Sequence, residues 1–153
     1  MLLKPCNGWT DFMLEGAEVF GLSYIDDIAF EWIEQAIHGL EVMQPFCVKG
    51  FLEPNRMLCT VSFWNCHVII EDDDRHTLKQ DDIEVMYSHT SMIDFCKNLY
   101  NDVSSNIDEW VSFLDYDDEN LEQKKQRLIK MLERLKELIN LREERFGENR
   151  CFL

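Results

Sequence analysis

Short segments of alternating apolar and polar residues open the chain and give way to a longer segment of helical periodicity. Residues 10–14 and 18–24 predict two strands joined around Gly16 as a hairpin. Asp26 or Asp27 then offers an N-cap for the helical segment. Its apolar residues predict an amphipathic helix of about 13 residues. They are Ile28, Trp32, Ala36, Ile37 and Leu40.

In the middle of the chain, apolar and polar residues again alternate with a shorter period. Pro45 ends the helix, and the apolar residues after it recur with the period of two that is typical of strands. This pattern predicts strands over residues 46–52, 57–65, 66–70 and 83–87. The Glu-Pro-Asn-Arg sequence after the first of them is a turn signal. The polar, acidic residues 71–82 predict a loop before the last of them.

The part of the chain that follows is predominantly helical. Ser91 and Asp94 have the spacing of a capping box. Apolar residues then recur at intervals of one, three or four over residues 95–114. This pattern predicts one long helix or two shorter ones, with a break near residues 104–106. Residues 115–120 follow as an acidic connector.

The final helix is the longest one that the sequence predicts. Asn120, together with Gln123, offers a cap for a helix over residues 121–145. Its apolar stripe is wider than the two-position seam of a coiled coil, which favours packing on its own domain over pairing with a second copy in a dimer. The stripe consists of Leu121, Leu128, Leu132, Leu135 and Ile139, widened by Ile129, Met131 and Leu138.

The order of these elements predicts an α+β fold. Because long crossovers do not separate every pair of successive strands, we expect a mostly antiparallel sheet of about five to six strands, with helices on one face and a long C-terminal helix. We expect a single domain over residues 1–153, which is long enough to bury a core. Residues 1–119 form its acidic α+β body in this prediction, and residues 120–146 form an amphipathic helix that packs on the body.

The net charge of the chain also differs between residues 1–119 and residues 120–153. Residues 1–119 hold 24 Asp and Glu against 6 Lys and Arg, a net charge of −18. Residues 120–153 hold 6 Glu against 9 Lys and Arg, a net charge of +3, and the whole chain carries −15. A surface of this sign repels nucleic acid and anionic membranes, so we expect neither as a partner. It suits a basic protein partner, or solubility alone.

No motif in the sequence indicates catalysis or a bound metal. The carboxylates of residues 71–74, Asp81 and Asp82 lack the glycine of a calcium-binding loop, and Arg75 interrupts them. The histidines and cysteines lack the spacings of zinc sites. The Gly-x-Ser-x-Gly, phosphate-loop and Gly-x-Gly-x-x-Gly motifs are missing. We therefore expect a non-enzymatic protein with no metal and no cofactor.

The cysteines favour a reducing compartment. The chain has six of them, scattered without a Cys-x-x-Cys pair, and several lie in apolar surroundings, where reduced cysteine acts as a small hydrophobic residue. The first residues lack the pattern of a signal peptide, and no stretch reaches the roughly 18 apolar residues of a membrane span. We expect a cytoplasmic protein that is a monomer or a homodimer.

Two kinds of residue are candidates for contact with a partner. Trp64 falls out of register with the apolar face of its strand, so we expect it to be exposed and to act as an apolar anchor. Trp32 and Trp110 lie on apolar helical stripes instead, and we expect both in the core. The carboxylates that we expect to form a charged rim around a binding surface are Asp72, Asp73, Asp74, Asp81 and Asp82.

The first half of the chain resembles a group of small, largely uncharacterised bacterial proteins. Three segments carry the resemblance: Gly-Trp-Thr-Asp-Phe at 8–12, Leu-Ser-Tyr-Ile-Asp-Asp at 22–27 and Phe-Leu-Glu-Pro at 51–54. Some acidic members of the group resemble immunity proteins of polymorphic toxin systems. The pattern is structural, with Ser23 and Asp26 forming a turn and a cap, so it implies no functional residue. The basic C-terminal helix departs from that group.

These observations together predict an acidic protein-binding module. Its carboxylates would stand where phosphates otherwise bind on a basic partner, and the resemblance implies that this partner is a toxin domain. Two alternatives stay open. One is a small enzyme or ligand-binding domain whose pocket the sequence does not reveal. The other is a self-associating structural module that uses residues 121–145.

Overall fold

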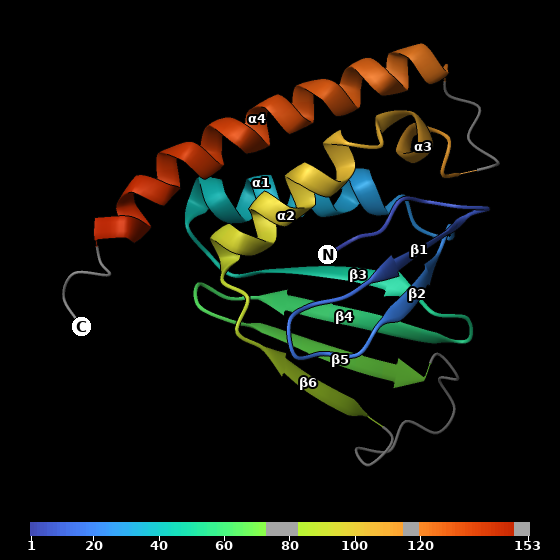
Figure 1. Ribbon diagram of the computed structural model, residues 1–153, viewed down its shortest axis with the longest axis horizontal. Coiled ribbons are helices and arrows are strands. Elements are labelled where there is room, and N and C mark those ends of the chain that lie inside the picture. Colours follow the sequence, from blue (N-terminus) through green and yellow to red (C-terminus); the bar gives the residue numbers. More distant parts are fainter. Residues whose placement is uncertain (73–82, 115–119, 149–153) are drawn as a thin grey trace.

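The computed structural model describes residues 1–72, 83–114 and 120–148 of the chain. These residues form six strands and four helices, in the order that the sequence predicts (Figure 1). The two-helix alternative for residues 95–114 is the one observed. The elements are β1 (Trp9–Phe12), β2 (Phe20–Ser23), α1 (Ile28–Val42), β3 (Phe46–Phe51), β4 (Asn55–Val61), β5 (Cys66–Asp72), β6 (Glu84–Ser88), α2 (Met92–Ser104), α3 (Ile107–Val111) and α4 (Leu121–Glu148).

The described strands form two antiparallel sheets. β1 and β2 pair as the predicted hairpin, and β3, β4, β5 and β6 form a second sheet in sequence order. The α+β class and the number of strands are confirmed, but the hairpin forms a sheet of its own. It lies against β3, where Leu22 contacts Gly50. A Cβ atom on Gly50 would come within 2.9 Å of Leu22 Cδ2, so the glycine permits this close approach.

One face of the four-stranded sheet is buried beneath the helices, which lie on the same side of it (Figure 1). Along β4, Met57, Cys59 and Val61 are fully buried, which confirms the face that the period of two predicts. Trp32 of α1 and Trp110 of α3 are buried as well. Both tryptophans therefore belong to the core, as the helical spacing predicts.

The opposite face of the sheet is only partly shielded from solvent. Val85 and Tyr87, the large apolar residues of β6, point to this outer face and are 47% and 68% exposed. Met86 lies between them and turns toward the core, where it is half-buried. The Tyr87 ring stacks on that of His67 in β5, with 4.5 Å between the ring centroids. The strand is where the sequence predicts it, but its largest side chains face outward.

Three helix starts that the sequence predicts use their capping residues differently. Ser91 caps α2, because its Oγ accepts a hydrogen bond from the backbone N–H of Asp94 at 3.1 Å. Asn120 caps α4 in the same way, accepting from the N–H of Gln123 at 3.2 Å. Asp27 occupies the N-cap position of α1, but its side chain forms no capping hydrogen bond.

The long helix α4 lies across α1 and α2, on the side away from the sheet (Figure 1). Leu121, the first predicted member of its stripe, is 58% exposed. Lys124 is fully buried in its place, because Asp27 at the start of α1 supplies a partner: Lys124 Nζ lies 3.0 Å from Asp27 Oδ2. The buried apolar residues of α4 are Leu128, Leu132, Leu135, Leu138 and Ile139.

Further charged contacts attach α4 to the acidic body. Arg134 forms an ion pair with Glu41 of α1 at 2.9 Å, and the Arg142 guanidinium donates to backbone carbonyls in the last turn of the same helix. On the other flank, Lys125 pairs with Asp108 of α3 at 2.7 Å. The positive charge that the sequence places in the C-terminal helix is thus used largely within the fold.

Candidate protein-binding surface

The segment that contains the predicted acidic rim begins and ends at one end of the four-stranded sheet. β5 ends at Asp72 and β6 begins at Glu84, and the register places both ends together, with Asn55 opposite Asp72 and Ile70 opposite Glu84. Asp73, Asp74, Asp81 and Asp82 lie outside the described residues, and the structure describes only the backbone of Asp72. The chain therefore enters and leaves the acidic segment at a single sheet end.

Described carboxylates extend this end of the sheet. Glu53 lies in the turn between β3 and β4, Glu71 lies near the end of β5, and Glu84 opens β6. We name these three residues, with the backbone of Asp72, the acidic end of the sheet. Glu71 forms an ion pair with Arg56, at 2.7 Å between Nη2 and Oε2. Glu53 and Glu84 are exposed, and neither forms an ion pair with a cation of the described chain.

Trp64 does not lie at the acidic end. It occupies the turn between β4 and β5, where the N–H of Ser62 donates to the carbonyl of Asn65 at 2.9 Å. Its side chain is 55% exposed, as the sequence predicts, although it projects from a turn and not from a strand. The seven residues of β5 separate it from Asp72, a span of about 20 Å. The structure therefore does not bring the predicted anchor and the predicted rim together.

The carboxylates at the start of α1 form a different environment. Lys49 Nζ lies 3.5 Å from Asp26 Oδ1 and 3.9 Å from Glu31 Oε2, and Lys124 pairs with Asp27. Desolvation raises the pKa of Glu31, and the neighbouring charge of Asp26 adds to this effect. Cations of the fold contact all three carboxylates here, whereas at the acidic end only Glu71 has a cation partner among the described residues.

Three thiols of the described residues have a raised pKa. Burial raises the pKa of Cys96, and desolvation also raises the pKa of Cys47, although that residue is exposed at the surface. A hydrogen bond with Cys66 and burial raise the pKa of Cys59. A raised pKa keeps each of these thiols protonated near neutral pH, and the thiolate is the reactive form. Cys59, Cys66 and Cys96 are therefore packing residues of the core.

Two other kinds of site are absent from the described residues. They contain no group of three or more His, Cys, Asp or Glu side chains placed to hold a metal ion. None of the described helices has the length and apolar content that a bilayer span requires.

Comparison with known proteins adds no family to these observations. No family model matches the chain, and neither a curated protein sequence nor a solved structure matches it. The assignment of function therefore depends on the chemistry of the surface itself.

Sequence reasoning missed the role of Lys124. The residue precedes Leu128 by four positions and so continues the apolar stripe of α4 by one turn. A lysine on an apolar stripe was the available signal, because a buried lysine requires a paired carboxylate. That carboxylate, Asp27, lies almost a hundred residues earlier in the chain, and only the folded structure brings the two together.

Proposed function

We propose that the protein is a non-enzymatic acidic binding module, and that the acidic end of the sheet contacts a basic surface of its partner. One observation carries the proposal. Glu53 and Glu84 are exposed there without a cation of the described chain, and the chain leaves the sheet at Asp72 and returns at Glu84 on the same end. Such a place gains most from a cationic partner.

The rest of the described surface supports this choice. A cation of the fold that already holds a carboxylate reduces the attraction of that carboxylate for a partner. Ion pairs of this kind occupy Lys4, Lys49, Arg56, Lys97, Lys124, Lys125 and Arg134. The net charge of −15 therefore remains mostly on carboxylates outside these pairs, and it would steer a basic protein toward the molecule.

The mechanism that follows is occlusion. The carboxylates would take the place of phosphates on a basic partner, and their charge would keep nucleic acid away from the complex. A toxin domain with a nucleic-acid-binding cleft has the required chemistry, so we propose an immunity protein as the biological form of this module.

The test is capture of a basic protein from the native host on immobilised full-length protein. A basic protein should be recovered at low salt and released at about 0.5 M salt, where the Debye length falls to a few ångströms. A double variant, Glu53→Gln with Glu84→Gln, should slow its association several-fold. Failure to recover any basic protein at low salt would overturn the proposal.

A matched control keeps the total charge change equal. Glu133→Gln with Glu144→Gln removes two exposed carboxylates from α4, away from the acidic end. This control should retain the association rate within about twofold. If both double variants slow association equally, net charge alone and not the acidic end recruits the partner.

A further inference from the structure

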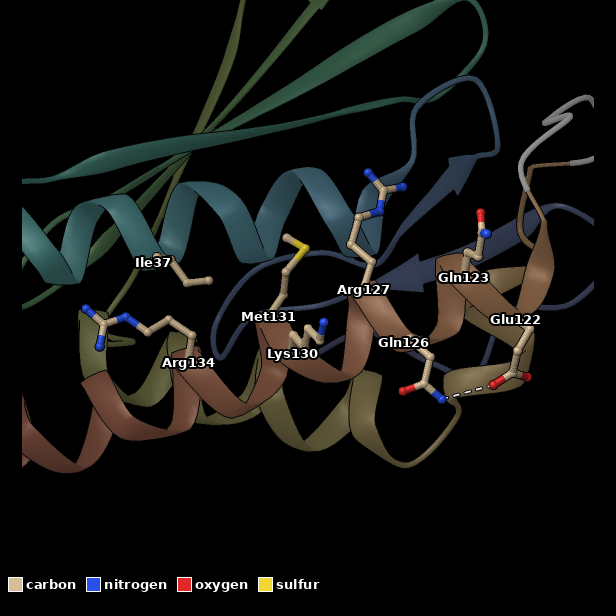
Figure 2. A pocket seen from close by; sticks show the side chains of 8 residues that line it. All are labelled: Ile37, Glu122, Gln123, Gln126, Arg127, Lys130, Met131 and Arg134. Atoms are coloured by element: carbon tan, nitrogen blue, oxygen red, sulfur yellow. Dashed lines mark hydrogen bonds between the residues drawn. The ribbon is translucent and has the colours of Figure 1, made fainter.

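The seam between α1 and α4 contains a groove that is lined by cations, whereas the chain as a whole has a net charge of −15. The two helices run side by side in the same direction, since Lys124 contacts the start of α1 and Arg134 its last turn. The groove between them has a volume of about 570 Å³. Figure 2 shows Ile37 of α1 and Met131 of α4 pointing toward the space between the helices. Both side chains are half-buried and supply an apolar floor.

Three cations line this groove, at positions three and four residues apart on α4. The Arg127 guanidinium lies over the Phe30 ring of α1, 4.5 Å from its centroid. Arg134 is fixed by Glu41 and Glu137, so its charge is already balanced. Lys130 lies between these two arginines in the sequence. The spacing places all three on one face of the helix.

Lys130 is the cation of this set that an anion would engage. Its side chain is exposed, and no carboxylate of the described residues forms an ion pair with it. Glu122, at the far end of the groove, is the one carboxylate that the described residues contribute to its lining, and its Oε1 accepts a hydrogen bond from Gln126 Nε2 at 2.9 Å. The groove therefore combines an available ammonium group with apolar surface.

We propose that this groove binds a small organic anion with an apolar body. Its carboxylate, sulfonate or phosphate would contact Lys130, and its apolar part would lie on Ile37 and Met131. Charge complementarity favours an anion at this lining, and the volume falls within the roughly 300–1,000 Å³ of small-molecule sites. This site is separate from the acidic end of the sheet and does not depend on the proposed protein partner.

The probe for the test is 8-anilinonaphthalene-1-sulfonate, a sulfonate with an aromatic body whose fluorescence rises in apolar surroundings. Its neutral analogue, N-phenyl-1-naphthylamine, lacks the charge. Titration of the full-length protein at about 0.15 M salt limits the long-range repulsion by the acidic body. We expect saturable binding of the sulfonate at one site, and binding of the neutral analogue that is weaker by about tenfold.

Two charge reversals on the same helix locate the site. Lys130→Glu should weaken sulfonate binding by about tenfold or more. Lys136→Glu changes the net charge equally but acts outside the groove, where the Lys136 ammonium lies 5.6 Å from the ring centroid of Tyr100. Binding by this control should stay within about twofold of the original protein. Far-UV circular dichroism verifies that both variants keep their helices.

Each outcome decides the proposal. Tenfold weaker binding in Lys130→Glu alone supports the site. Equal loss in both variants overturns it, because the sulfonate would then respond only to net charge. Equal binding of the sulfonate and the neutral analogue, or no saturable binding of either, overturns it as well. None of these results bears on capture of a basic protein at the acidic end, so the two proposals fail independently.

Discussion

The acidic end of the sheet and the seam between α1 and α4 contain the same kinds of carboxylate in opposite situations. At the seam, Asp27 and Glu41 are held by Lys124 and Arg134 of the C-terminal helix. At the acidic end, Glu84 has no such partner among the described residues. The comparison shows that the net charge of a sequence does not indicate which carboxylates can attract a partner. The ion pairs that form on folding decide which carboxylates can still attract a partner.

The largest effect on stability is expected when the buried cation of the seam is removed. Lys124→Ala leaves the carboxylate of Asp27, whose side chain is 15% exposed, without this partner, so we expect the free energy of unfolding to fall by about 3–5 kcal/mol. Chemical denaturation of the full chain measures the change. At the acidic end, Glu84→Gln should alter it by less than about 0.5 kcal/mol.

A companion variant separates charge from packing in this result. Lys124→Met with Asp27→Asn removes both charges and keeps most of the buried volume, so it should recover a large part of the lost stability. If the double variant is no more stable than Lys124→Ala, the loss arises from packing and not from an uncompensated carboxylate.

The next effect concerns the buried apolar side of α4. Leu135 is fully buried, so Leu135→Ala should lower the free energy of unfolding by about 2–4 kcal/mol through lost burial and a residual cavity. Leu121→Ala is the matched control, since Leu121 is 58% exposed, and its effect should stay below about 0.5 kcal/mol. Equal effects in thermal or denaturant unfolding would contradict the orientation of α4.

The smallest effect comes from the carboxylates at the start of α1. Burial raises the pKa of Glu31 from its ordinary value of 4.5, so the folded state holds this proton more tightly than the unfolded state does. The ionised form is therefore disfavoured by folding, and stability falls as the pH rises through this range. Glu31→Gln should remove the penalty and raise the free energy of unfolding at pH 7. The gain should be below about 0.5 kcal/mol, because the Glu31 side chain is 40% exposed.

Measurement at two pH values tests the sign of this effect. Well below pH 4.5 the glutamate is protonated in both states, so the difference between Glu31→Gln and the original protein should shrink. A variant that is less stable than the original protein at pH 7 would show that the contact with Lys49, at 3.9 Å, outweighs the desolvation of the carboxylate.

Local patterns in the sequence were sufficient for most of the elements. The period of two places Met57, Cys59 and Val61 on the buried face of β4, and the short-range caps at Ser91 and Asn120 form as their spacing predicts. These features depend on residues a few positions apart, so the sequence contains them directly.

Features that depend on distant partners could not be predicted in this way. The burial of Lys124 depends on Asp27, and the packing of the hairpin on β3 depends on the close approach of Leu22 to Gly50. The separation of Trp64 from Asp72 follows from the pairing of β4 with β5, which turns a short interval in the sequence into opposite ends of a strand. Sequence proximity was a poor guide to the candidate surface for that reason.

The guanidinium of Arg142 links the first helix of the protein to the last. Its Nε donates to the carbonyl of Leu40 at 2.8 Å and its Nη2 to that of Glu41 at 3.0 Å, and these carbonyls have no partner within their own helix. During synthesis, α1 leaves the ribosome about a hundred residues before this arginine does. Arg142 can therefore close the C-terminal end of α1 only after about a hundred further residues have been made.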